Sequence, residues 1–174
     1  MKFFRFSIIL IFGCFYLVFN QQIEAKPASA LQFSISFDKD EYKTKDPIYI
    51  NFELKNKGPK PIYVNKRFYV GSEDSDPRDR EVFFQIRGPS GEKLPYKASS
   101  YDIGFPKTDY FVLLGPKEGI ASERKKNLKA YFDLGAPGKY KIAAVYQNMY
   151  GAEIGIKAFR DKIKSKPVTI KVVE

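Results

Sequence analysis

The sequence lacks most of the residues that carry enzyme chemistry. It contains no histidine, no tryptophan and one cysteine, Cys14, which lies in an apolar stretch near the N-terminus. Without histidine, a Ser-His or Cys-His catalytic pair cannot form, and zinc, copper and iron lose their usual ligands. No pair of carboxylates stands out as a glycosidase site, and residues 135–138 lead into a strand rather than a phosphate-binding helix. We therefore expect no enzyme activity and no cofactor, apart from a candidate calcium site.

The N-terminus has the layout of a secretory signal peptide. Lys2 and Arg5 precede a predominantly apolar run over residues 6–19, and a basic segment before a short apolar segment is typical of export signals. A membrane-spanning helix needs about 20 apolar residues, which is more than this run provides. We therefore predict an exported protein, secreted or periplasmic, that keeps no stable transmembrane segment after cleavage.

Small residues after the apolar run offer two cleavage positions, after Ala25 or after Ala30. We predict a signal peptide over residues 1–30 and one domain over residues 31–174, a length typical of a single domain. Two alternatives remain open: lipidation of Cys14 after lipoprotein-type cleavage, and an uncleaved membrane anchor. The predicted domain has no cysteine, so its core must stabilise it without disulfide bonds.

The chain is basic, with 30 Lys or Arg residues against 20 Asp or Glu residues, a formal net charge of +10 and a pI of about 9.5. An excess of positive charge favours solubility and attracts polyanions. Outside a cell these are lipid head groups, acidic glycans and wall polymers, so we expect a protein or an envelope polymer as partner and no nucleic acid. The alternative interpretation is a lysine-rich surface that is simply solvated.

Apolar and polar residues alternate along most of the predicted domain. A period of two is typical of a half-buried strand, and clusters of Gly, Pro, Asn and Asp separate the alternating segments. We predict strands over 31–37, 48–54, 82–87, 93–96, 110–114, 120–124, 139–147 and 167–173. Residues 61–64 and 67–70 are either two short strands or one strand with a bulge at Asn65-Lys66. Helical spacing occurs near 128–132 and 156–163. This pattern indicates an all-β fold, an antiparallel β-sandwich of about 7–9 strands.

Four stretches resemble bacterial exported immunoglobulin-like domains. Residues 40–50 resemble the opening of such domains before their second strand, and residues 56–62 resemble their Asn … Lys-Pro-Ile step into the third strand. Residues 89–91 and 137–140 are similar to their hairpins that end in Gly-x-Tyr. The resemblance implies an immunoglobulin-like sandwich over 31–174, a fold that many functions share. The opening is also similar to that of macroglobulin-type modules, and the sandwich to the intracellular proteinase inhibitor family of bacilli.

Residues 134–147 predict a turn followed by one long strand. Pro137 and Gly138 form the turn. Tyr140 stands where an immunoglobulin domain has its tyrosine corner, in which the hydroxyl bonds back to the main chain. Ile142 stands where such domains have their second cysteine, consistent with the absence of a disulfide bond. The resemblance therefore implies structural roles for Pro137, Gly138 and Tyr140.

An acidic segment follows the fourth predicted strand and is a candidate calcium site. Its carboxylates are Glu73, Asp74, Asp76, Asp79 and Glu81. Clustered carboxylates are the ligands that calcium prefers, although their spacing here matches no EF-hand loop. The alternative is a solvated loop whose charge is neutralised by the neighbouring Arg78 and Arg80.

The predicted function is binding: a non-catalytic, exported immunoglobulin-like module that binds a protein or an envelope component at residues that the sequence does not reveal. The alternative is a proteinase inhibitor that acts through an exposed loop, with 97–109 and 148–164 as candidates. A third hypothesis is a structural module in which calcium or an exposed edge strand matters more than a ligand. Tyrosine is favoured at interfaces, and the candidates for partly exposed tyrosines are Tyr49, Tyr63, Tyr69, Tyr96, Tyr101 and Tyr150.

Overall fold

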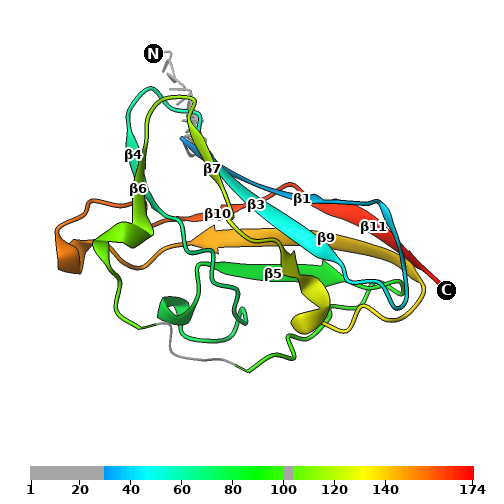
Figure 1. Cartoon of the computed structure of the whole chain (residues 1–174). Helices are drawn as coiled ribbons and strands as arrows, with labels where there is room; N and C mark the ends of the chain where they lie inside the picture. The colour runs from blue at the N-terminus through cyan, green and yellow to red at the C-terminus, as the bar shows by residue number, and fades with distance from the viewer. Residues whose placement is uncertain (1–29, 100–103) are drawn as a thin grey trace, which may run out of the picture.

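The computed structural model describes residues 30–99 and 104–174, and its architecture is all-β (Figure 1). The strands are β1 (Leu31–Phe37), β2 (Glu41–Lys43), β3 (Tyr49–Asn56), β4 (Ile62–Asn65), β5 (Val82–Arg87), β6 (Phe111–Leu114), β7 (Gly119–Ala121), β8 (Lys126–Asn127), β9 (Gly138–Gln147), β10 (Lys162–Lys164) and β11 (Val168–Val173). Short 3₁₀-helices are η1 (Pro77–Asp79), η2 (Thr108–Tyr110), η3 (Leu128–Ala130) and η4 (Ala152–Ile154). None of the helices in the described residues is long and apolar enough to cross a membrane. The predicted all-β class is confirmed, whereas the predicted signal peptide lies outside the described residues, apart from Ala30.

Two sheets face each other, and nearly all their strand pairs are antiparallel. In the first sheet, β3 pairs with β1 along one edge and with β7 and β8 along the other. In the second sheet, β9 pairs with β5 along one edge and with β10 and β11 along the other, and β2 joins β11 in parallel. Strands β4 and β6 pair separately and rise at one end of the molecule (Figure 1). The chain therefore forms two layers with a projecting β4–β6 arm.

Aromatic side chains join the two sheets across the core. The ring of Phe33 in β1 lies 5.8 Å from that of Tyr146 in β9, and Phe52 in β3 lies 5.9 Å from Phe84 in β5. These residues fall on the inward positions of alternating strands, where a period of two places every second side chain in the core. Their burial supplies much of the apolar area that holds the layers together.

The turn before β9 is held at three of its residues. Gly138 has a φ of 143°, and a Cβ atom there would lie 2.5 Å from the Cβ of Pro89, so any larger residue would clash. The hydroxyl of Tyr140 donates a 2.7 Å hydrogen bond to the carbonyl of Ala136, four residues upstream. Pro137 lies between these groups, exposed to solvent. The turn thus brings the chain into β9 with Tyr140 pointing into the core.

Four predicted strands differ from the observed ones. Of the strand predicted over 120–124, only the first two residues belong to β7, which ends at Ala121. Residues 67–70 make only an isolated bridge, because Phe68 has a φ of 52°, which interrupts the extended backbone. Residues 93–96 likewise form a single bridge. The strand that was expected to be buried at 110–114 is present as β6, but Leu113 is 46% exposed. This exposure arises because β6 pairs with β4 in the arm, beside the two layers rather than within them.

The helix expected near 156–163 is absent: η4 precedes that segment and β10 begins inside it. The amide of Asn148 donates to the carbonyls of Tyr150 at 2.7 Å and of Phe159 at 3.0 Å. A side chain therefore satisfies the main-chain groups that a helix would have paired. By contrast, the helical turn expected near 128–132 is present as η3.

Candidate functional site

The side chains of Arg67 and Glu81 form a buried ion pair. The Nη2 atom of Arg67 lies 2.5 Å from Oε1 of Glu81, and the side chains are 5% and 1% exposed. The amide of Asn65 also donates to Oε1 at 3.1 Å, and the backbone N–H of Tyr69 donates to Oε2 at 3.0 Å. Burial raises the pKa of the Glu81 carboxyl, while the Arg67 guanidinium and these donors oppose the rise. Such a pair is retained only with nearly complete hydrogen bonding.

Three tyrosine rings surround the guanidinium of Arg67. Its Cζ atom lies 4.8 Å from the ring centroid of Tyr110 and 5.5 Å from those of Tyr69 and Tyr150. A cation held over an aromatic face is attracted by about 0.5–2 kcal/mol per ring, depending on how far it is desolvated. The arginine therefore joins three segments that are far apart in the sequence.

Buried polar groups fix the backbone on either side of Arg67. The hydroxyl of Tyr146 in β9 donates to the carbonyl of Asn65 and accepts from its N–H, both at 3.0 Å. Phe68, next to Arg67, adopts a left-handed φ of 52°, which a bulky residue tolerates only where its surroundings enforce it. Its ring is buried and stacks 5.7 Å from Phe52, so core packing holds this strained residue in place.

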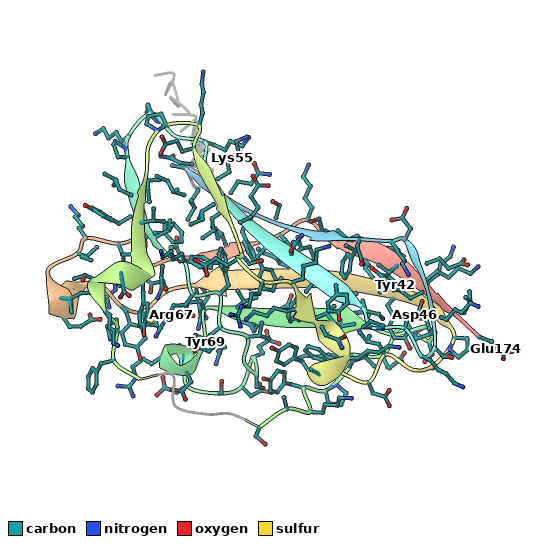
Figure 2. The ribbon with its side chains drawn as sticks, viewed as in Figure 1. Tyr42, Asp46, Lys55, Arg67, Tyr69 and Glu174 are labelled. Atoms are coloured by element: carbon teal, nitrogen blue, oxygen red, sulfur yellow. The ribbon has the colours of Figure 1, made fainter. Side chains whose placement is uncertain are left out.

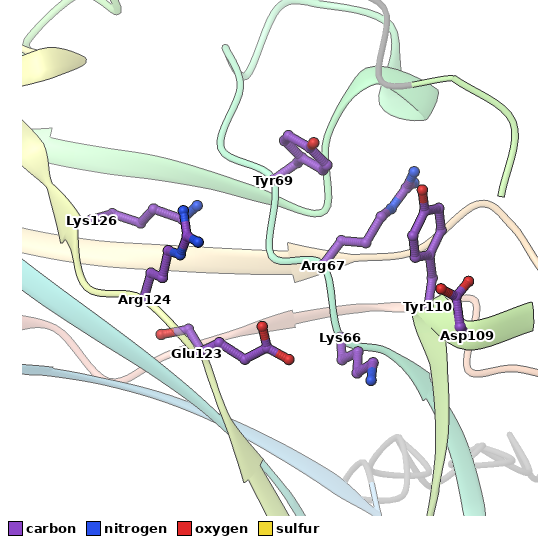
Figure 3. A pocket seen from close by; sticks show the side chains of 9 residues that line it. Lys66, Arg67, Tyr69, Asp109, Tyr110, Glu123, Arg124 and Lys126 are labelled. Atoms are coloured by element: carbon purple, nitrogen blue, oxygen red, sulfur yellow. The ribbon is translucent and has the colours of Figure 1, made fainter. Parts of the chain in front are cut away.

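A pocket of about 420 Å³ opens beside the ion pair. We call it the basic pocket, and its lining residues are Lys66, Arg67, Tyr69, Asp109, Tyr110, Ser122, Glu123, Arg124 and Lys126. One wall is formed by β8 and the segment between β7 and β8, and the opposite wall by the segment after β4 and by η2, which precedes β6 (Figure 3). Arg67 and Tyr69 lie toward the end of the molecule opposite Glu174, the C-terminal residue (Figure 2).

In the basic pocket, positive groups without an ion-pair partner outnumber such negative groups. Within residues 30–99 and 104–174, Lys66, Arg124 and Lys126 take part in no ion pair within 4.0 Å. The acidic residues of the lining are Asp109 and Glu123. A concave site lined by cations concentrates anions and strengthens their attraction. Chemically, the pocket can therefore hold a carboxylate or phosphate group beside tyrosine rings.

The structure does not gather the five carboxylates of the candidate calcium site. Glu73 pairs with Lys93 at 2.8 Å, and this hydrogen bond lowers its pKa. Asp76 pairs with Arg78 at 2.8 Å, which lowers its pKa to about 2. Glu81 lies in the buried pair, whereas Asp74 is exposed and Asp79 closes η1; no group of three acidic, His or Cys side chains suited to a metal occurs among the described residues.

The carbonyl oxygens of this acidic loop face an arginine. The guanidinium of Arg80 donates to the carbonyls of Ser75 and Asp76 through Nη1 and to that of Glu73, at 2.9 Å, through Nη2. Carbonyl oxygens are also calcium ligands, so Arg80 occupies acceptors that a cation would need. The predicted neutralisation of the loop by arginines is therefore present, while the calcium site itself stays a prediction.

Sequence reasoning identified part of the basic pocket and its surroundings. Tyr69 and Tyr150 were among the tyrosines expected at the surface, and Glu81 was assigned to the calcium candidate. The cations were missed, although Lys66-Arg67 and residues 124–126 form two short basic runs at the ends of predicted strands. Those runs were the available signal, but their meeting depends on pairing between distant strands.

Comparison with known proteins does not assign the chain to a family. No protein-family model matches it, and a search of curated proteins finds no match. A functional proposal must therefore rest on the geometry and the charge of the site.

Proposed function

We propose that this protein is a non-catalytic, exported module with an immunoglobulin-like β-sandwich, secreted or periplasmic, that binds an acidic group of a protein or an envelope component. The basic pocket is its binding site. The fold part of the proposal is supported by the two facing antiparallel layers and by the hydrogen bond from Tyr140 to the carbonyl four residues upstream, the arrangement of a tyrosine corner.

One observation carries the binding site. Lys66, Arg124 and Lys126 line the same pocket without an acidic partner among the described residues. The wall that carries Lys66 is fixed by the buried ion pair of the adjacent Arg67, so a ligand would meet a surface that needs little ordering on binding. Such preorganisation reduces the entropic cost of association.

The remaining polar groups of the pocket are better suited to binding a ligand than to catalysing a reaction. The hydroxyl of Ser122 accepts a 3.2 Å hydrogen bond from the backbone N–H of Phe52, so it serves the main chain of β3. Tyr69 and Tyr110 face the guanidinium of Arg67. An acidic ligand group would find charge and flat aromatic surfaces here, which are typical means of recognition.

Titration of the mature domain with two small acids tests the site. Glucuronate supplies a carboxylate and glycerol 3-phosphate supplies a phosphate, so the two arms also identify the preferred group. We expect saturable binding of at least one acid, weakened at least tenfold in the double variant Arg124→Gln/Lys126→Gln. The matched control is Lys57→Gln/Lys60→Gln, two exposed lysines in the β3–β4 turn. Equal affinity of the pocket variant and the control, or binding of neither acid, would overturn the proposal.

A second candidate function is proteinase inhibition through an exposed loop. The observation that favours it is Phe105, which is 90% exposed beside the buried Pro106 in the segment 97–109. A panel of serine, cysteine and metalloproteases, each assayed with micromolar domain, tests it. Slowing of a protease that disappears in Phe105→Ala would support inhibition, and an unaffected panel would exclude this loop as an inhibitor.

A further inference from the structure

The second sheet presents a strongly basic outward face. Side chains alternate along its strands, and the positions that do not point into the core carry nearly all of its charge. The basic residues of its strands are Lys43, Arg87, Lys139, Lys141, Lys162, Lys164 and Lys171, all exposed. The strands of this sheet contain one acidic residue, Glu41. We call this surface the basic face.

Like charges stand directly opposite each other on the basic face. In the pairing of β5 with β9, Arg87 lies opposite Lys141, and in the pairing of β11 with β9, Lys171 lies opposite Lys139. Glu41 relieves only the second pair, through a 2.8 Å ion pair with Lys171. Like charges at cross-strand positions destabilise a sheet. A bound anion would remove this repulsion, so the unliganded face is arranged for a negative partner.

The opposite layer has no such excess of charge. On its outward side, β1 carries Ser34 and Ser36, while Glu53 and Lys55 of β3 balance each other. The excess of positive charge therefore lies on the outward side of the second sheet. The large exposed apolar residues also lie elsewhere among the described residues: Tyr49, Tyr63, Phe105, Leu113 and Met149. The basic face therefore lacks the apolar anchors that a membrane-inserting surface uses.

A groove of about 410 Å³ opens on the basic face, and Arg87, Lys141, Lys164 and the small Ala143 are among its lining residues. Its lining also includes Glu73, whose carboxylate is neutralised by Lys93 at 2.8 Å. Along β9, Lys139 and Lys141 are two residues apart, about 7 Å at the usual rise of a strand. Neighbouring strands bring further cations within about 5 Å of this row. Cations repeated at this spacing along the face, with the groove beside Lys141, match a chain with regularly repeated charges better than a single small anion.

We propose that the basic face binds a linear polymer of phosphate groups along this groove. Six of the seven cations are lysines, whose ammonium groups bind phosphate as point charges. Arg87 is the one arginine of the face. Each phosphate that a lysine neutralises releases a counterion, so affinity grows with the number of contacts and falls steeply with salt. The face and the basic pocket share no residue, so this second site goes beyond the proposed function.

The experiment measures binding of linear inorganic polyphosphate to the mature domain, with orthophosphate at equal total phosphate as the single-group comparison. We expect polyphosphate to bind at least tenfold more tightly than orthophosphate. The double variant Lys139→Glu/Lys141→Glu should weaken polyphosphate binding at least tenfold. It should also reduce the slope of log affinity against log salt concentration by about 0.7 for each lost contact. The control Lys57→Glu/Lys60→Glu changes the net charge equally and should shift affinity less than twofold.

Each other outcome overturns the proposal. Polyglutamate that binds as tightly as polyphosphate would assign the face to carboxylates, and vesicles of phosphatidylglycerol that compete better would assign it to lipid. An equal loss of binding in the control variant would reduce the effect to net charge. The pocket variant Arg124→Gln/Lys126→Gln should keep full polyphosphate affinity. Loss of polyphosphate binding in that variant would place the polymer at the pocket and refute this second site.

Discussion

Arg67 and Glu81 form an ion pair of 2.5 Å beside the basic pocket, and neither side chain exposes more than 5% of its surface. Arg67 precedes the strained Phe68, and Glu81 directly precedes β5. The pair therefore connects the pocket wall to the edge of the second sheet. Its burial means that each charge depends on the other, because neither is solvated by water.

Removing one partner of this pair should destabilise the protein strongly. Glu81→Gln leaves the guanidinium of Arg67 buried without a counter-charge, and we expect a loss of about 3–5 kcal/mol in the free energy of unfolding, measured by urea denaturation. The double variant Glu81→Leu/Arg67→Met removes both charges and should regain most of that loss. A loss of less than about 1 kcal/mol in the single variant, the range of surface pairs, would show that water reaches the pair.

The alternation of apolar residues was sufficient to predict the all-β class but not the site. Residues 31–37 were predicted as a strand and form β1, since a period of two shows on its own which side chains face the core. Phe68 shows the limit of such reasoning. Its left-handed backbone is held by packing against Phe52 of β3, a contact between distant segments that no local pattern contains.

The basic pocket could not be predicted from the sequence for a related reason. Lys66 and Arg124 come together because β4 pairs with β6 while β3 pairs with β7 and β8. Such pairings are decided by the whole fold rather than by either segment. Likewise, the acidic residues near 73–81 looked like one cluster in the sequence, but separate basic partners divide them in the structure.

The hydrogen bond between Tyr42 and Asp38 makes the stability of the fold depend on pH in the alkaline range. The hydroxyl of Tyr42 donates a 2.5 Å hydrogen bond to Asp38, and burial together with this bond raises the pKa of Tyr42 from 10.0 to about 12. Because the folded state favours the protonated tyrosine, its contribution is fully present below pH 10 and is lost as the pH rises toward 12. The difference corresponds to at most about 2.7 kcal/mol.

The variant Tyr42→Phe should therefore be less stable than the wild type at pH 8, by about 0.5–1.5 kcal/mol for the lost hydrogen bond. Its stability should decline less between pH 10 and 12. Denaturant unfolding of both proteins at several pH values measures the difference. Parallel declines in the two proteins would mean that Tyr42 titrates normally. Tyr146, whose pKa burial also raises, is present in both proteins and cancels from the comparison.

Calcium should leave the thermal unfolding of the domain over residues 31–174 unchanged. Arg80 already binds three carbonyl oxygens of the acidic loop, and Glu73 and Asp76 have basic partners. We expect unfolding curves in a chelator and in millimolar calcium to coincide. Arg80→Met, which frees the carbonyls, should lower stability by about 1–3 kcal/mol. A rise in the unfolding temperature of the wild type on adding calcium would instead support the site predicted from the sequence.

Lys141→Glu should stabilise the unliganded protein while it weakens polyphosphate binding. The new carboxylate would stand opposite Arg87 in the register of β5 and β9, where an opposite-charge pair contributes about 0.2–1 kcal/mol. Added salt should stabilise the wild type slightly, because it screens the repulsion between Arg87 and Lys141, and should weaken the new pair in the variant. Urea denaturation at low and high salt measures both effects, with Lys57→Glu as a control that creates no cross-strand pair. A variant less stable than the wild type at low salt would show that the two cations do not repel each other. A gain in stability together with a loss of affinity would indicate that the repulsion on the basic face is maintained for a bound anion.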